Sequence, residues 1–414
     1  MDLLRFLTAG SVDDGKSTLI GRLLYDSKSI LADQLEAIER SSKNKAEGEI
    51  DLALLTDGLR AEREQGITID VAYRYFSTPK RKFIIADTPG HVQYTRNMIT
   101  GASNASLIIV LIDARQGVVE QTRRHSIIAS LLRIPHVVVA VNKMDLVDYS
   151  KERFDQIADE YSKVATQLGL NEVTYIPMSA LKGDNIVEKS EQMNWYQGKP
   201  LLEFLEEIEL TQDINLTTPR FQVQYVLRPQ TEELHDYRGY AGKISSGAYS
   251  KGDTIVVLPQ NIETTLTKIE IAGKEVENAF APQSVVLHLA DDIDVSRGDL
   301  FIKKGHEPKI ASELEVLLCW LDEKPLQPGN KYLLQHNSRL IRTVVRSIDY
   351  KLDVNTLAQQ TVEEPVRLNE VVKANIKTAS PLVFDSYLDL PSNGAAILVD
   401  ETSNSTVAAV LLRS

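Results

Sequence analysis

The sequence predicts an α/β domain with a phosphate-binding loop and a mostly parallel, doubly wound sheet, followed by two antiparallel β-barrel domains. Near the N-terminus, a glycine-rich loop separates an apolar strand-like run from a helical one. Up to about residue 210, further strand-like runs alternate with helical patterns. Beyond that point, period-two segments and short turns with glycine predict small barrels. We therefore expect a nucleotide-binding domain over 1–212 and barrels over 213–310 and 311–414.

Size and composition are those of an ordinary globular protein. The chain has 414 residues, of which 25% are charged and 43% hydrophobic, and no apolar run approaches the length of a membrane span. The single cysteine, Cys319, excludes an internal disulfide and is expected to be a small buried hydrophobe. The net charge of −12 argues against nucleic acid as the main partner. With no secretory signal visible either, we expect a cytoplasmic protein without a membrane partner.

The phosphate loop is the stretch 10–17, GSVDDGKS, which fits G-x-x-x-x-G-K-[ST]. It follows the strand-like run 4–9 and precedes the helical run 18–24, so loop amides and a helix N-terminus converge on one anion. We expect Lys16 to bridge the β- and γ-phosphates and the Ser17 hydroxyl to bind Mg²⁺. The loop alone leaves ATPases, kinases and GTPases open. The expected nucleotide contacts here are Gly10, Ser11, Val12, Asp13, Asp14, Gly15, Lys16, Ser17 and Thr18.

Two further segments are placed to sense the γ-phosphate. The run 82–86 is followed by Asp87-Thr88-Pro89-Gly90, where we expect Asp87 to hold Mg²⁺ through water and the Gly90 amide to meet the γ-phosphate. The charged segment 25–65 is too long for an ordinary connection, which indicates a mobile functional region. Gly66-Ile67-Thr68-Ile69 closes it, and Thr68 is expected to complete the Mg²⁺ shell.

The base is specified at the ends of two later strands. Asn142-Lys143-Met144-Asp145 follows the strand-like run 136–142, and the Asp145 carboxylate can accept two hydrogen bonds from guanine that adenine cannot donate. Ser179-Ala180-Leu181 follows the run 174–178, and the Ala180 amide can bond guanine O6. These motifs select a GTPase domain. The expected contacts to the base are Asn142, Lys143, Asp145, Ser179, Ala180 and Leu181.

His91 directly follows Gly90, a position from which a side chain can orient the attacking water, as Gln does in Ras-type proteins. We therefore expect His91, Lys16 and Thr68 to be the catalytic residues. An apolar gate of Val12 and Ile67 that keeps His91 away until a partner signals is a hypothesis. The role of the Asp13-Asp14 pair stays open: Asp13 either faces outward or helps to hold a cation.

With these motifs, the chain resembles the translational GTPases related to elongation factor Tu over nearly its whole length. One branch is more similar: the stretch 10–26 looks like the signature of the sulfate adenylyltransferase large, GTPase subunit. Elongation factors have His where this chain has Ser11 and Asp14, and usually Thr where it has Ser17. The segment 87–98 also fits the branch, which often has Glu in place of Val92. Segments 220–226, 238–242 and 293–299 fit it as well.

The resemblance implies a smaller catalytic subunit as partner, in a heterodimer or larger assembly. That partner would convert ATP and sulfate to adenosine 5′-phosphosulfate and pyrophosphate, and GTP hydrolysis in this chain would drive this uphill step. Some relatives carry a fused kinase domain; because this chain ends at Ser414, after the third domain, we expect that activity to be absent. The alternatives are an elongation-type factor that delivers RNA and a stand-alone GTPase switch. The acidic balance, Ser11 and Asp14 favour sulfate activation.

Overall fold

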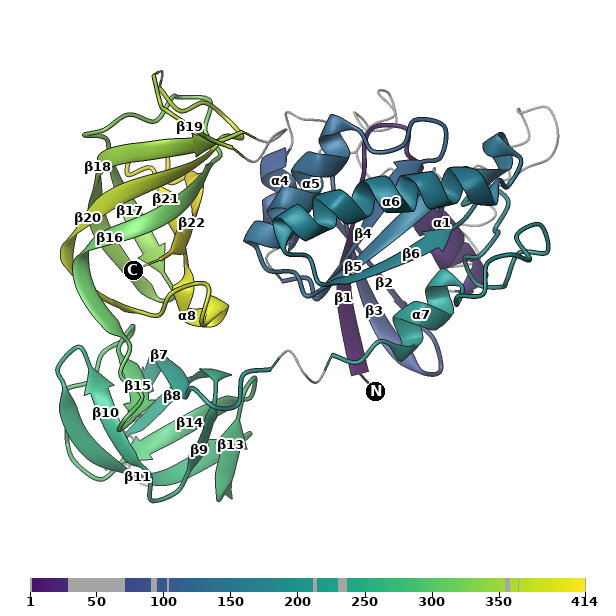
Figure 1. The fold of residues 1–414 in the computed structure, drawn as a ribbon. Coiled ribbons are helices and arrows are strands. Elements are labelled where there is room, and N and C mark those ends of the chain that lie inside the picture. The colour runs from purple at the N-terminus through teal and green to yellow at the C-terminus, as the bar shows by residue number, and fades with distance from the viewer. Residues whose placement is uncertain are drawn as a thin grey trace. The chain divides into compact units, whose positions relative to one another are not determined.

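The computed structural model describes residues 2–28, 71–90, 95–102, 104–210, 214–229, 237–353, 358–363 and 365–413. They fall into two compact units, one ending at Leu210 and one that follows it (Figure 1). We describe each unit by itself. Among these residues, no helix combines the length and the apolar character needed to cross a membrane.

The first unit is built on a six-stranded sheet with the order β2-β3-β1-β4-β5-β6. All neighbouring strands pair in parallel except β2 and β3, which are antiparallel. The strands are β1 (Asp2–Ala9), β2 (Ala72–Ser77), β3 (Arg81–Asp87), β4 (Leu107–Asp113), β5 (His136–Asn142) and β6 (Glu172–Pro177). The helices are α1 (Lys16–Asp26), α4 (Thr95–Ala102), α5 (Glu120–Leu131), the 3-10 turn η3 (Met144–Val147), α6 (Lys151–Leu168) and α7 (Leu201–Glu207).

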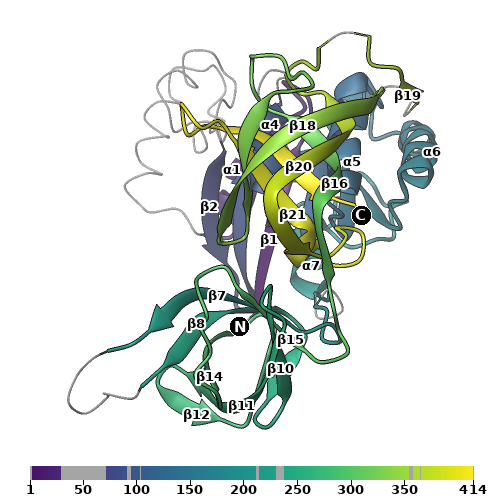
Figure 2. The ribbon, with the colours of Figure 1, turned by 90° about the vertical axis from the view of Figure 1, so that its left-hand side faces the viewer.

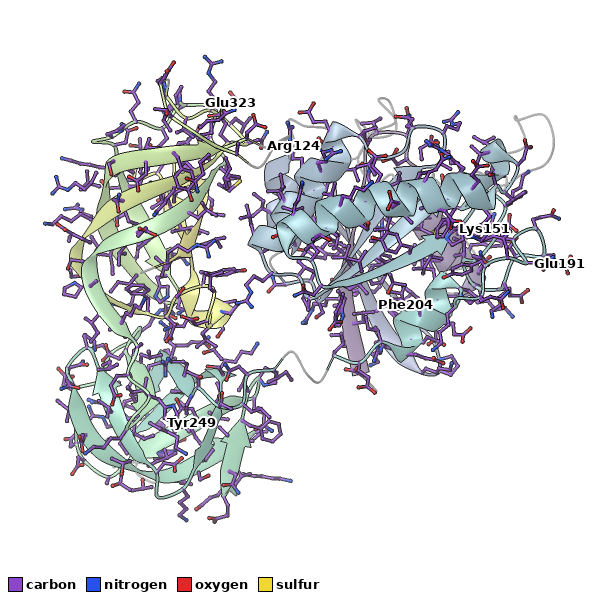
Figure 3. The ribbon with its side chains drawn as sticks, viewed as in Figure 1. Arg124, Lys151, Glu191, Phe204, Tyr249 and Glu323 are labelled. Carbon is purple, nitrogen blue, oxygen red and sulfur yellow. The ribbon has the colours of Figure 1, made fainter. Side chains whose placement is uncertain are left out.

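Helices cover both faces of this sheet, which confirms the predicted doubly wound α/β architecture. Every residue of β4 and β5 is buried, as their unbroken Val/Ile/Leu runs predict for strands covered on both sides. Apolar residues of α1 and α7 share one core cluster with those of the sheet. On the other face α5 packs beside α6, where the Ser126 and Tyr161 hydroxyls hydrogen-bond at 2.8 Å. Figure 3 labels Lys151 at the start of α6 and Phe204 on α7.

The second unit contains two closed antiparallel barrels, as the sequence predicts. The first barrel follows the order β10-β15-β7-β8-β14-β11 and closes through the β10–β11 pairing; Figure 2 shows these strands arranged as a ring. Its strands are β7 (Arg220–Leu227), β8 (Gly239–Ser246), β10 (Thr254–Leu258), β11 (Ile262–Ile271), β14 (Ser284–Leu289) and β15 (Leu300–Lys303), with short β9 (Ala248–Ser250), β12 (Lys274–Val276) and β13 (Asn278–Phe280) at its margin. Tyr249 lies inside this barrel (Figure 3) and its hydroxyl donates to Phe301 O at 2.8 Å.

The second barrel follows the order β17-β21-β22-β16-β20-β18 and closes through the β17–β18 pairing. Its elements are β16 (Lys309–Trp320), β17 (Lys331–His336), β18 (Arg339–Leu352), β19 (Gln359–Gln360), β20 (Val371–Phe384), α8 (Pro391–Gly394), β21 (Ala395–Val399) and β22 (Thr406–Leu412). Cys319 is only partly buried. Leu318 and Trp320 of β16 point into the barrel core, so the alternation of the strand turns Cys319 to the outer side and the expectation of a buried thiol is only partly met.

The contact between the two barrels combines an apolar cluster with a charged pair. Val383 of β20 packs with residues of β10 and β15. Beside it Arg220, only 2% exposed, donates from Nε and Nη2 to the two carboxylate oxygens of Asp385, both at 2.8 Å. Asn393 Nδ2 donates to the same carboxylate at 2.8 Å. A paired, hydrogen-bonded charge of this kind tolerates burial that an isolated one would not.

Candidate functional site: a guanine-nucleotide site

The loops at the carboxyl ends of β1, β3, β5 and β6 carry the expected site residues that the structure describes. This edge is where open α/β sheets bind ligands, because parallel strands all point their loops the same way. The loop after β1 leads into α1, whose N-terminus supplies unpaired main-chain N–H groups.

The phosphate loop turns sharply at two left-handed residues. Asp13 has φ 70° and Gly15, directly before α1, has φ 96°. A glycine meets this conformation without strain. Asp13 is exposed, whereas Asp14 is only 3% exposed and accepts a hydrogen bond from Ser11 N at 2.5 Å. The two acidic residues therefore have opposite orientations, and Asp13 faces outward, one of the two possibilities left open by the sequence.

Lys16 is buried and reaches back over the loop. Its Nζ donates to Gly10 O at 2.9 Å and to Ser11 O at 2.8 Å. Burial lowers the pKa of Lys16, and the carboxylates of Asp87 and Asp14 oppose that shift. The ammonium group thus faces the inside of the loop, where a phosphate oxygen could replace the two carbonyl groups.

The end of β3 lies against this lysine. Asp87 is 1% exposed, and its Oδ1 accepts from the Thr8 hydroxyl at 3.4 Å. The Thr88 hydroxyl donates to Thr8 O at 2.6 Å, which fixes the start of the following loop to β1. Any side chain at Gly90 would clash with the Lys16 ammonium and with the main chain of the phosphate loop. Gly90 is therefore close enough for its amide to share a ligand with Lys16.

Asn142 joins the phosphate loop to the loop after β6, which is expected to contact the base. Its Nδ2 donates to Asp14 O at 2.8 Å, and its Oδ1 accepts from Ala180 N at 2.9 Å. Lys143, with φ 62°, hydrogen-bonds to Asp13 O and forms an ion pair with Asp113 at 3.0 Å. Asn142 and Lys143 therefore hold together three loops that are far apart in the sequence.

Asp145 carries the observation that points most directly to a base. Its Oδ1 is buried and has no hydrogen-bond partner among the described residues. An unpaired buried acceptor costs about 1–3 kcal/mol, so the atom suits a ligand that brings its own N–H groups. Met144 N donates to Met178 O at 3.1 Å, which holds this turn beside the loop after β6. The donor pair of guanine fits this acceptor.

The loop after β6 engages its neighbours mainly through its main chain. The Ser179 hydroxyl accepts from Lys182 N at 3.2 Å, and Ser179 O accepts from Gly183 N at 2.8 Å, so its polar groups close the turn. Leu181 is 49% exposed. The expected contact through the Ala180 amide thus competes with Asn142 Oδ1, which already accepts from that N–H.

Sequence reasoning missed Asp113 and Arg22. Burial opposes ionisation of Asp113, but hydrogen bonds from Arg115 and Lys143 outweigh it and lower the pKa of Asp113 to about 2. Arg22 of α1 donates to Ala180 O at 3.3 Å and to Leu181 O at 2.6 Å, and these hydrogen bonds hold the loop after β6 against α1. A carboxylate ending the apolar run 107–113 was the available signal for Asp113, whereas nothing in the sequence pairs Arg22 with residues 158 and 159 positions away.

The structure thus brings together the residues expected in 10–18, Asp87, Gly90 and the two loops expected to contact the base. Thr68 and His91 lie outside the described residues, as does Ile67 of the hypothetical gate. Within the described ranges, no three His, Cys, Asp or Glu side chains gather as a metal site. The expected Mg²⁺ set does not require such a cluster, because it uses one carboxylate, Asp87, together with the hydroxyls of Ser17 and Thr68.

The family comparisons agree with this geometry. Residues 1–213 match the family model described as elongation factor Tu GTP binding domain, and residues 313–412 match the GTP-eEF1A C-terminal domain-like model. Among solved structures, the GTPase-like domain of Saccharomyces cerevisiae Ski7 bound to GTP aligns with a TM-score of 0.52 and 18% identity, covering 99% of this chain and 97% of that chain. At this identity the match supports the fold alone.

Curated relatives are considerably more similar. Sulfate adenylyltransferase subunit 1 from Bacteroides thetaiotaomicron is 52% identical, covering 98% of this chain and 85% of the relative. The same subunit from Alteromonas mediterranea is 50% identical, covering 99% and 87%. The bifunctional enzyme CysN/CysC of Mycobacterium tuberculosis is 53% identical over 98% of this chain, which spans 66% of that longer protein.

Proposed function

Because the chain belongs to the sulfate adenylyltransferase subunit 1 family, with a GTP-binding domain of the elongation factor Tu type, we propose that it is the GTPase subunit of a sulfate adenylyltransferase. In this function, GTP hydrolysis drives formation of adenosine 5′-phosphosulfate and pyrophosphate from ATP and sulfate at a small catalytic subunit. The site observation that carries the GTP assignment is the buried, unpaired Oδ1 of Asp145.

The described residues divide the binding of GTP among them. Lys16 exchanges its two carbonyl partners for β- and γ-phosphate oxygens, while the loop amides up to Thr18 surround the phosphates. Asp145 accepts from guanine, and the Ala180 amide, shared with Asn142, bonds O6. Ser17, Thr68 and Asp87, the last through water, would hold Mg²⁺, which when bound neutralises charge on the phosphate oxygens.

His91 is the proposed group that orients the attacking water, with Val12 and Ile67 as a gate. Gly90, directly before it, is in contact range of Lys16, which supports a position near the γ-phosphate. His91→Ala should abolish GTP turnover in the assembled complex and leave nucleotide affinity within about twofold of the wild type. Full turnover in that variant would exclude the role.

The partner is proposed to be the small catalytic subunit, in a heterodimer or larger assembly in the cytoplasm. The relatives' name, subunit 1, supports a partner. The barrels over 213–310 and 311–414, after a GTP-binding domain over 1–212, are the proposed docking platform. RNA delivery is the less favoured function, because the similar curated relatives are named for sulfate activation and the net charge is −12.

The deciding experiment measures pyrophosphate release from ATP and sulfate after co-expression of this chain with the small subunit. GTP should accelerate release, and sulfate should be required. A matched Asp145→Asn complex should respond to xanthosine triphosphate in place of GTP, which would show that this chain supplies the energy. Release that ignores GTP and sulfate, together with tight binding of aminoacyl-tRNA, would overturn the proposal.

A further inference from the structure

The buried carboxylate of Asp14 has no evident structural need for its charge. Its Oδ2 accepts from Ser11 N at 2.5 Å, and among the described residues it forms no ion pair. A Cβ placed on Gly10 would lie 3.1 Å from this oxygen and 3.1 Å from Leu111 O. The carboxylate therefore fills the space behind the loop, between Gly10 and β4, rather than facing solvent. A neutral acceptor could also bond Ser11 N.

The hydrogen bonds place one peptide group between two opposite charges. The N–H of Ser11 points to Asp14, and the C=O of Gly10, which belongs to the same peptide group, accepts from Lys16 Nζ at 2.9 Å. An anion on the N–H side makes the carbonyl oxygen a better acceptor, and hydrogen bonds in a chain strengthen one another. The negative charge of Asp14 thus strengthens the hydrogen bond from Lys16 to Gly10 O, which the lysine must give up to bind phosphate.

The same charge acts directly on a bound nucleotide. Burial raises the pKa of Asp14, which indicates that its charge is poorly solvated, while the Ser11 N–H and the nearby charge of Lys16 oppose that shift. Poorly solvated charges interact over longer distances than exposed ones. A diphosphate in the loop and the carboxylate behind it would therefore repel each other.

We propose that Asp14 weakens the grip of the phosphate loop on GDP and so accelerates its release from this chain. Its hydrogen bond to Ser11 N shapes the loop, and its charge favours the arrangement in which Lys16 stays hydrogen-bonded to Gly10 O. The inference rests on the proposed function in that the site binds guanine nucleotides.

The test is the dissociation rate of fluorescent N-methylanthraniloyl-GDP from the full chain, chased with excess GDP in a stopped-flow instrument. Asp14→Asn keeps the shape and an acceptor for Ser11 N but removes the charge. It should slow release at least tenfold, equivalent to about 1.4 kcal/mol. Asp14→Ala leaves the Ser11 N–H without its acceptor and should lose part of that gain.

Asp155→Asn on α6 is the matched control, because it removes one exposed carboxylate that pairs with Lys151, away from the loop. It should leave the release rate within twofold of the wild type. Asp14→Ser serves as a second neutral variant with an acceptor if Asp14→Asn does not fold. Release from the neutral variants as fast as from the wild type, or faster, overturns the inference. A wild-type chain that binds no guanine nucleotide would instead overturn the proposed function.

Discussion

Asn142 Nδ2 donates a hydrogen bond to the main-chain oxygen of Asp14 at 2.8 Å. The side chain is 2% exposed, and its Oδ1 also accepts from Ala180 N at 2.9 Å. A single buried amide thus connects the loop expected to hold phosphates with the loop expected to hold the base. The phosphate loop and the loop after β6 are therefore coupled through Asn142, and we expect a substitution in one loop to change how the other binds the nucleotide.

Asn142→Ala should weaken GDP binding by about 30-fold or more, because two buried main-chain groups lose their partner at about 1–3 kcal/mol each. Equilibrium titration with fluorescent GDP measures the effect. Lys163→Ala, at an exposed pair with Asp159, is the control and should bind normally. An unchanged affinity of the Asn142 variant would show that the linkage carries no energy.

Asp145→Asn should lower the affinity for GTP at least tenfold and raise that for xanthosine nucleotides. The amide presents an N–H where guanine also presents donors, and the buried Oδ1 has no other partner among the described residues. Competition between GDP and xanthosine diphosphate for the fluorescent nucleotide gives the ratio. If GTP affinity stays the same, Asp145 is not the base-reading residue.

Arg22→Ala should raise the KM for GTP about three- to tenfold and leave kcat unchanged, since its guanidinium supports Ala180 O and Leu181 O without facing the phosphates. Arg22→Lys keeps one donor and should recover part of the loss. Lys151→Ala, at an exposed position of α6, is the control. A fall in kcat at constant KM would contradict a supporting role for Arg22.

Arg220→Ala should destabilise the two-barrel unit by about 3–5 kcal/mol, because it leaves the Asp385 carboxylate buried without its cation. Urea unfolding followed by circular dichroism measures the loss. The exposed Lys163–Asp159 pair provides the comparison, since solvent screens such a pair and removing it should leave the urea midpoint almost unchanged. Equal midpoints for the two variants would mean that the contact between the barrels contributes little.

His336 should make the second barrel sensitive to acid. Burial lowers the pKa of His336 to about 4, against the opposing hydrogen bond with Asn393 O at 3.0 Å. The unfolded chain, with a histidine pKa near 6.5, binds this proton first, so stability is complete above about pH 6.5 and falls as the pH drops toward 4. The loss amounts to at most roughly 3 kcal/mol. Urea midpoints at pH 7.5 and 5 measure this loss, and the midpoint of His336→Gln should change less between the two pH values. An equal change in the wild type and the variant would show that His336 is not the source of the acid sensitivity.

The fold could be predicted because its signals are local. Buried parallel strands need both faces apolar, and the runs 107–113 and 136–142 show this directly, so β4 and β5 end where the sequence indicates. The amphipathic run 201–209 predicts a helix, but that helix stops at Glu207, because Ile208 adopts extended dihedral angles that no local pattern indicates. Period-two segments predicted the two barrels. The strand pairings that close them, β10 with β11 and β17 with β18, came only from the structure.

For the candidate site, the sequence predicted which residues lie at the strand ends but not which contacts they make. Parallel strands bring their carboxyl ends to one edge, so Gly10, Asp87 and Asn142 were expected near one another. The contacts of Asp113 with Lys143 and of Arg22 with the loop after β6 were not predictable, because each depends on which strands become neighbours.

The sequence by itself determined the family, the kinds of groups offered to a nucleotide and the order of the domains, since these depend on residue types at fixed spacings. Only the tertiary structure decided what each group does when no nucleotide competes for it. Lys16 bonds to Gly10 O and Ser11 O, Asp14 turns inward while Asp13 turns outward, and Asp145 keeps a buried oxygen unpaired. The physical reason is that hydrogen bonding and burial depend on neighbours in space, and some of these come from distant parts of the sequence, as Asp14 O does when it accepts from Asn142, 128 positions away.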